Sequence, residues 1–332
     1  MKNREIKTRN QIKLLELIKK EISPSMNLVD AVSEKLGVAH AATYRRMRGE
    51  KIMSFDEAVK LCNAFNISMD SFVSVTNQKL IQCHYTPLNL SDIKDFILFV
   101  QTSLESFENI KKAKGELILT AVDIPIFHLL PYKELTLFKL FSWSKSVYDF
   151  TGDYEAFVKE TDGVETLSIN YKKILDNYRL IPSTEVWTDN TTDTIVRLIR
   201  HHFIMEHFDD KETPILLCNQ LMDLMDTLQE WTKNGTKELN TPFKFYVCET
   251  DIANTFILFK SAKRSNCMVR LYTINGLGIS DESFCKETEN WLQKSIQQSI
   301  LISGTAERER INFFNAQRKK ITNLIDKINV CD

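Results

Sequence analysis

The sequence predicts a mainly α-helical protein with an α+β body, in which a small N-terminal helical bundle precedes a helix-rich domain with a small β-sheet. Only 9 Gly and 7 Pro occur in 332 residues, which leaves few sharp turns. Apolar residues recur every three or four positions through most of the chain, as one face of a helix requires. Short β-like runs separated by polar turns are confined largely to residues 243–273, so the expected sheet is small.

Composition excludes several classes of protein. With 43% hydrophobic and 26% charged residues, the chain is not expected to be disordered, collagen-like or a disulfide scaffold. No run approaches the roughly 18–20 apolar residues of a membrane span, and the charged N-terminus is unlike a secretory signal. The seven cysteines are odd in number and form no C-x-x-C pair, which indicates reduced thiols. We therefore predict a cytoplasmic protein that does not enter a membrane.

Charge is distributed unevenly along the chain, although its formal total is only −1. Residues 1–60 contain 13 Lys or Arg and 8 Asp or Glu, a net charge of +5, which leaves −6 for the other 272 residues. A basic head on an acidic body is expected of a nucleic-acid-binding module joined to another domain. A solvated basic face is the alternative interpretation.

Four helices are predicted in the first 65 residues. Apolar stripes predict helices at 5–22, 28–36 and 39–48, and Gly37 and Gly49 end the second and third of them. Ser54 and Glu57 form a capping-box pattern that begins a fourth helix, which runs to Phe65. A last short helix is expected over residues 69–73.

The spacing of these features resembles the helix-turn-helix domain of the XRE/Cro type of transcriptional regulator. In that family a helix ends in Leu-Gly-Val, as at residues 36–38, and a recognition helix ends in Gly twelve residues later, as Gly37 and Gly49 do here. The resemblance covers roughly residues 10–75. The family's usual apolar positions in the recognition helix fall at Thr43 and Arg46. We expect Tyr44 and Met47 to take the apolar role instead.

The resemblance implies that the helix over residues 39–48 lies in the major groove of double-stranded DNA. Arg46 is then expected to bind a guanine edge and Thr43 a thymine methyl or a polar base edge. His40 is expected to reach a base or a phosphate, and the remaining cations are expected to contact phosphates. The predicted DNA-binding residues are His40, Thr43, Arg45, Arg46, Arg48 and Lys51.

We predict three segments: a helix-turn-helix DNA-binding domain at residues 1–76, a linker at 77–90, and an α+β regulatory or oligomerisation domain at 91–332. In the last segment a buried strand is predicted near residues 116–122, with a three-strand meander at 243–248, 255–260 and 268–273. Amphipathic helices are predicted at 132–150, 192–208 and 214–231, and partly at 154–178. The final helix, after Thr305, has a heptad-like seam of Ile311, Phe314, Ile321, Ile325 and Ile328, interrupted by Arg318. We favour packing of that helix on the body over dimerisation.

Metal-binding and catalytic patterns are weak. His201, His202, Glu206 and His207 fall within the one helix predicted at 192–208, where His202 and Glu206, four residues apart, share a face. No second cluster with ligand spacing accompanies them, and the sequence does not assemble a Ser/His/Asp or Cys/His arrangement. We therefore predict no metal, no cofactor and no catalytic residue.

The sequence thus predicts a transcriptional regulator, not an enzyme. Because one helix-turn-helix module buries little surface, a homodimer on a two-half-site operator is expected. The body would sense a small-molecule effector, dimerise, or do both. Two alternatives stay open: a defence or toxin–antitoxin-type interaction protein with an autoregulatory helix-turn-helix, and an enzyme with a DNA-binding head.

Overall fold

The computed structural model describes residues 2–23, 26–69, 81–85, 93–148, 150–161, 165–250, 252–271 and 275–330. Its contacts divide the chain into a first unit, Met1–Gln82, and a second unit, Cys83–Asp332. This division falls inside the segment 77–90 that the sequence predicts as a linker. His84–Tyr85 of that segment form strand β1 of the second unit.

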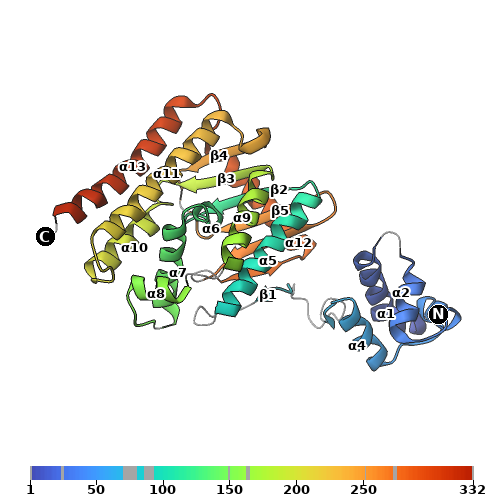
Figure 1. Cartoon of the computed structure of the whole chain (residues 1–332). Coiled ribbons are helices and arrows are strands. Elements are labelled where there is room, and N and C mark those ends of the chain that lie inside the picture. Colours follow the sequence, from blue (N-terminus) through green and yellow to red (C-terminus); the bar gives the residue numbers. More distant parts are fainter. Residues whose placement is uncertain are drawn as a thin grey trace. The chain divides into compact units, whose positions relative to one another are not determined.

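The described residues of the first unit include four α-helices close to the predicted positions: α1 (Lys2–Glu21), α2 (Leu28–Leu36), α3 (His40–Met47) and α4 (Phe55–Ala64) (Figure 1). Gly37 adopts the left-handed conformation that ends α2, with φ 69°. The capping box of Ser54 and Glu57 is present at the start of α4, as predicted. The small apolar core is formed by Leu14, Leu15, Ile18, Val32, Leu61 and Cys62. The helix predicted at 69–73 lies outside the described residues, apart from Met69.

The second unit is built on one mixed sheet of eight strands in the order β1-β7-β6-β5-β2-β3-β4-β8. β2, β3 and β4 are parallel, and the other neighbouring strands pair antiparallel. After β1, the strands are β2 (Glu116–Ala121), β3 (Ser183–Thr188), β4 (Phe243–Cys248), β5 (Phe256–Lys260), β6 (Ser265–Arg270), β7 (Gly276–Ile279) and β8 (Ile300–Leu301).

Helices cover both faces of this sheet (Figure 1). Side chains alternate across β2, as in any strand: Leu117 and Leu119 join the large core, whereas Ile118 joins a smaller core with Leu292 of α12. Many helices contribute to the large core. The helices of the second unit are α5 (Ile93–Lys112), α6 (Ile126–Leu129), α7 (Lys133–Val147), α8 (Tyr154–Thr161), α9 (Glu165–Arg179), α10 (Asp193–Ile204), α11 (Glu212–Asn234), the 3-10 turn Glu238–Asn240, α12 (Glu282–Gln297) and α13 (Glu307–Val330).

The last helix, α13, packs on α10 and α11, which confirms the favoured packing (Figure 1). Its buried seam differs from the predicted one, because Ile311 is 40% exposed. Arg318 does not interrupt the seam, since its Nε donates to Asp226 Oδ1 of α11 at 3.0 Å. The buried seam has heptad spacing and is formed by Arg310, Phe314, Gln317, Ile321, Leu324 and Ile328.

The sheet corrects both the size and the strand order that the sequence predicts. With eight strands it is larger than predicted, and its interior strand β3, between β2 and β4, is not among the predicted strands. The expected meander is wrong as well, because β4 pairs with β3 and β8, whereas β5 pairs with β2 and β6. The α+β class itself agrees with this architecture. Among the described residues, no helix combines the length and apolar character needed to cross a membrane.

Candidate nucleic-acid interface

The inward face of α3 carries two polar side chains that are almost wholly buried. Thr43 is 0% exposed, and its hydroxyl lies 2.8 Å from the Ser33 hydroxyl of α2. Arg46 is 1% exposed. Its Nε donates to Glu57 Oε2 at 3.1 Å, and a second guanidinium nitrogen pairs with the other oxygen of the same carboxylate. The hydrogen bonds from Arg46 hold the pKa of the Glu57 carboxyl below its ordinary value.

The assignment of Thr43 and Arg46 to base contacts is therefore corrected. Both side chains are used inside the unit, so neither is exposed to reach a base edge. The apolar positions typical of the family are indeed the inward ones, but here polar residues occupy them. The expected inward shift to Tyr44 is wrong, because Tyr44 is 47% exposed.

A third contact fixes the end of α3. Gln11 of α1 is 8% exposed, and its Nε2 donates to the carbonyl oxygens of Arg46 and Lys51 at 2.6 and 3.0 Å. Its Oε1 accepts from the backbone N–H of Met53 at 2.8 Å. An eight-residue helix is marginal in isolation. Contacts from α1, α2 and α4 together therefore fix its position.

The outer face of α3 consists of His40, Ala41, Tyr44, Arg45 and Arg48, all exposed. Their spacing places them along one side of a helix. Lys51, which follows α3, is exposed as well. The sequence pattern indicates His40, Arg45, Arg48 and Lys51 but not Tyr44, because an aromatic residue at helical spacing is typical of a buried core.

Acidic residues lie near two basic side chains of this face. His40 Nε2 is 3.3 Å from Asp30 Oδ1, and Arg48 Nε is 3.4 Å from Glu50 Oε1. Exposed pairs of this kind contribute little stability and exchange readily. They leave both basic side chains able to contact a phosphate oxygen instead.

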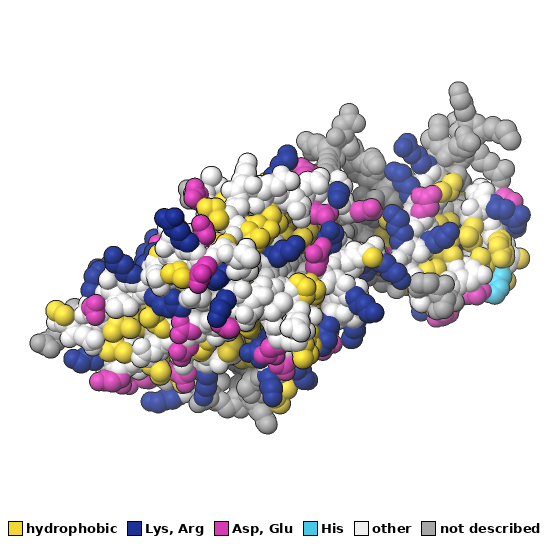
Figure 2. Space-filling model, turned by 90° about the horizontal axis from the view of Figure 1, so that it is seen from above, with side chains coloured by type: hydrophobic (Ala, Val, Ile, Leu, Met, Phe, Trp, Pro, Cys, Tyr) yellow, Lys and Arg dark blue, Asp and Glu magenta, His cyan; other side chains and the backbone are white. Residues whose placement is uncertain are grey.

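The second unit carries a mixed surface charge. On the face seen in Figure 2, lysine and arginine side chains are interspersed with acidic ones, so no single-sign field extends over that face. Such a surface gives no general attraction for a polyanion.

Among the described residues of the second unit, two buried groups of ionisable side chains are centred on a carboxylate. Glu185 of β3 accepts hydrogen bonds from His128, Tyr178 and Trp187, at 3.0, 2.5 and 2.8 Å. Burial alone would raise the pKa of Glu185, but His128 and these hydrogen bonds outweigh it and hold the pKa below its ordinary value. All three donors bind the same carboxylate, and Glu185 is 0% exposed. These hydrogen bonds join β3 to α6 and α9 inside the core.

The second group lies after the carboxyl end of β2. Asp123 Oδ2 accepts from Lys139 Nζ at 2.6 Å and from Arg270 at 3.1 Å. Asp123 and Lys139 are 2% and 1% exposed. Burial opposes ionisation of Asp123, yet the two cations keep the pKa of its carboxyl below the ordinary value.

The histidine cluster does not have the expected geometry. α10 ends at Ile204, so His202 and Glu206 do not share a helical face. Instead, His202 Nδ1 lies 2.8 Å from His207 Nδ1, and its Nε2 lies 3.1 Å from the Ser142 hydroxyl. Burial and the neighbouring cationic groups lower the pKa of His202 to about 3, so its ring is neutral at pH 7.

In the described part of the chain, one group of side chains has metal-ligand spacing: Asp153, Glu155 and Asp209, whose ligand atoms lie within 4.8 Å of one another. Asp153 already accepts from the backbone N–H of Ala156 at 2.7 Å, and Glu155 accepts from that of Asp209 at 3.3 Å. These carboxylates thus have structural roles at a helix start and a loop.

Comparison with known proteins found no matching family model, no matching curated protein and no matching solved structure.

Proposed function

We propose that this protein is a sequence-specific transcriptional regulator whose first unit is a helix-turn-helix that binds double-stranded DNA. The observation that carries the proposal is the difference between the inward and the outward side chains of α3. Its inward side chains are committed to α2 and α4, while its outer face presents one aromatic ring, two arginines and one histidine. Base reading needs side chains of these types held on a rigid helix.

In this proposal Arg45 replaces Arg46 as the base-reading arginine, and Tyr44 contacts a base edge or a thymine methyl beside it. His40, Arg48 and Lys51 bind phosphates and set the register. The protein acts as a homodimer on half-sites centred about 10 base pairs apart, since one such module buries too little surface for tight binding. The α13 seam is not the dimer interface, because it is buried against α10 and α11.

Selection of bound duplexes from a random pool, with the full chain as bait, tests this proposal directly. We expect an enriched sequence with two related half-sites. Its Kd should rise steeply with salt, because bound phosphates release counterions. Arg45→Ala and Tyr44→Ala should each weaken binding to the selected site by about tenfold, which corresponds to the 1–3 kcal/mol of a base contact.

Lys19→Ala is the matched control, because Lys19 is an exposed cation on α1 outside the outer face of α3. It should change binding by less than about twofold, through long-range charge only. The proposal fails if no sequence is enriched, or if Arg45→Ala behaves like Lys19→Ala.

A further inference from the structure

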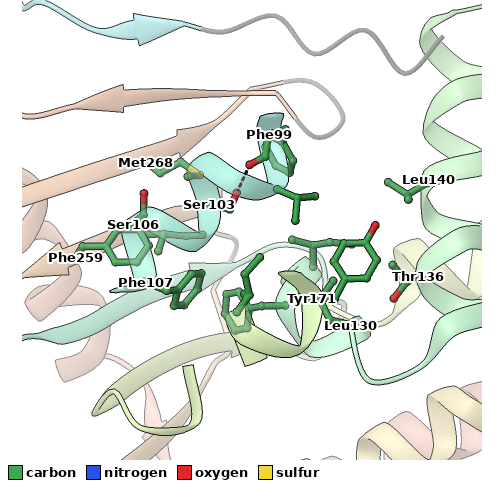
Figure 3. Close-up of a pocket in the computed structure, with 15 residues that line it drawn as sticks. Phe99, Ser103, Ser106, Phe107, Leu130, Thr136, Leu140, Tyr171, Phe259 and Met268 are labelled. Atoms are coloured by element: carbon green, nitrogen blue, oxygen red, sulfur yellow. Dashed lines mark hydrogen bonds between the residues drawn. The ribbon is translucent and has the colours of Figure 1, made fainter. Parts of the chain in front are cut away.

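The second unit contains an apolar cavity of about 70 Å³ bounded by α5, α6, α7, α9, β5 and β6 (Figure 3). Its fifteen lining residues are predominantly apolar, and none of them carries a charge. Helix α5 supplies a third of this lining. Five aromatic rings surround the cavity: Phe99, Phe107, Phe127, Tyr171 and Phe259.

Part of the wall of this cavity, at Phe107 and α6, is held in place by side-chain contacts. Phe107 makes edge-to-face contacts with Phe127 and Phe259, at centroid distances of 5.7 and 5.6 Å. The other side of α6 is anchored, because His128 is bonded to the buried Glu185. Protein interiors seldom keep a void much larger than a water molecule. A void with anchored aromatic walls has the character of a preformed ligand pocket.

Three of the four hydroxyl-bearing side chains of the lining, those of Ser103, Ser106 and Thr136, limit the chemistry of the ligand. Ser103 donates its hydroxyl hydrogen to Phe99 O at 2.9 Å, a bond drawn in Figure 3. Ser106 and Thr136 likewise donate to the carbonyls of Thr102 and Leu129. These three hydroxyls therefore offer lone pairs to the cavity and no hydrogens. A ligand that matches them is neutral and carries a hydrogen-bond donor.

The volume of the cavity also limits the size of the ligand. The cavity has less than half the volume of the roughly 150 Å³ engineered cavity that binds benzene. A ring-sized ligand therefore needs one wall to move. Met268 and Phe99 are only half-buried, and an unbranched thioether adapts readily to a new shape.

We propose that this cavity binds a small, neutral, mainly apolar molecule that carries one hydrogen-bond donor, of the phenol class. Binding would act on α5, the first helix of the second unit along the chain. The role of the ligand as an effector rests on the DNA-binding function proposed above, whereas the binding itself does not.

Methyl NMR of the full chain, labelled at the methionine ε-methyl groups, tests the site. Xenon and phenol should each shift the Met268 resonance, and neither should shift Met225, which is buried outside the cavity lining. Benzoate, a charged ring of similar size, should leave Met268 unchanged. The proposal is overturned if phenol leaves the Met268 resonance unchanged, regardless of the xenon result. It is also overturned if benzoate shifts that resonance as much as phenol does.

Two variants fill the cavity from neighbouring positions of α5, Ser103→Leu and Val100→Leu. Each should reduce the phenol-induced shift of Met268 at least threefold. Thr102→Leu is the matched control, because Thr102 makes the same hydroxyl-to-carbonyl bond but is exposed on α5, and it should preserve the shift. An unchanged shift in both filled variants that fold by circular dichroism would place the ligand elsewhere.

The effector role has its own readout. Phenol should change the Kd of the full chain for its selected duplex, and Ser103→Leu should remove that change. If phenol shifts the Met268 resonance without altering the Kd, the effector role is wrong, whereas the proposed ligand binding is supported. If the chain selects no duplex, the DNA-binding function fails, while the Met268 shift still decides the pocket.

Discussion

In the first unit, Arg46 is 1% exposed while its partner Glu57 keeps 25% of its side chain in solvent; in the second unit, Glu185 and His128 are exposed by no more than 1%. The difference follows from core size. A small unit buries a modest fraction of its surface, so its charged contacts lie between helices near the surface. The larger unit surrounds an ionised group completely. Solvent can therefore compensate a broken contact in the first unit, but not in the second.

The sharpest test of this comparison is Glu185→Leu. The change leaves the donors of His128, Tyr178 and Trp187 buried without an acceptor, so we expect a loss of about 3–5 kcal/mol in the free energy of unfolding. Tryptophan fluorescence reports this loss for the second unit alone, because all four tryptophans lie after residue 82. Glu249→Leu, the same substitution at an exposed site, should cost less than about 0.5 kcal/mol. A similar cost at both positions would contradict the role of burial.

Arg46→Met tests the corresponding contact in the first unit. We expect a smaller loss, about 2 kcal/mol, because water can reach the Glu57 carboxylate that remains. Hydrogen exchange of peptides from residues 40–65 measures this loss of stability. Glu57→Gln should reproduce most of the loss, whereas Arg45→Met should not. If Arg46→Met abolishes DNA binding while protection is unchanged, Arg46 would be a base contact after all.

A still smaller effect is expected from Thr43→Val, which leaves the Ser33 hydroxyl without its partner. The expected cost is about 1 kcal/mol in the same exchange measurement. The double variant Ser33→Ala with Thr43→Val should recover part of that cost, since no polar group is then left unpaired. A double variant that costs the sum of both single changes would show that the two hydroxyls are not coupled.

The smallest effect is a pH dependence confined to the first unit. Because the pKa of Glu57 is lower in the folded protein, its contribution to stability is complete above the unfolded pKa, near 4.5, and is lost as pH falls through the folded pKa. Exchange protection of α3 and α4, corrected for intrinsic rates, should therefore decrease below pH 4.5. In Glu57→Gln this segment should lose that part of its pH dependence, and an identical profile would show that another group titrates.

Local patterns in the sequence predicted the helices well. The apolar stripes and the capping box of Ser54 and Glu57 depend on residues a few positions apart, which the sequence displays directly. Strand β3 was missed for the opposite reason. Its sequence, STEVWT, contains Glu185, whose buried carboxylate is bonded to His128, a residue from a distant part of the chain.

The same limit applies to the candidate DNA-binding face. In the isolated sequence of α3, an arginine looks solvent-exposed and a tyrosine looks buried. Glu57, in a different helix, reverses that expectation by giving Arg46 a partner inside the unit. The cavity depends on side chains from six separate elements, so no local pattern indicates it.

Both ends of the eight-stranded sheet finish in strands of two residues, β1 and β8. Beside β8, the outward N–H groups of β4 are occupied as well, because Phe243 donates to Gly235 O and Phe245 donates to Ser303. Long unpaired edges recruit strands from other molecules and lead to aggregation. Blunt ends of this kind protect the protein from that fate at high concentration. At the β8 end, the occupied N–H groups of β4 leave little free edge to which a strand of a second copy could pair.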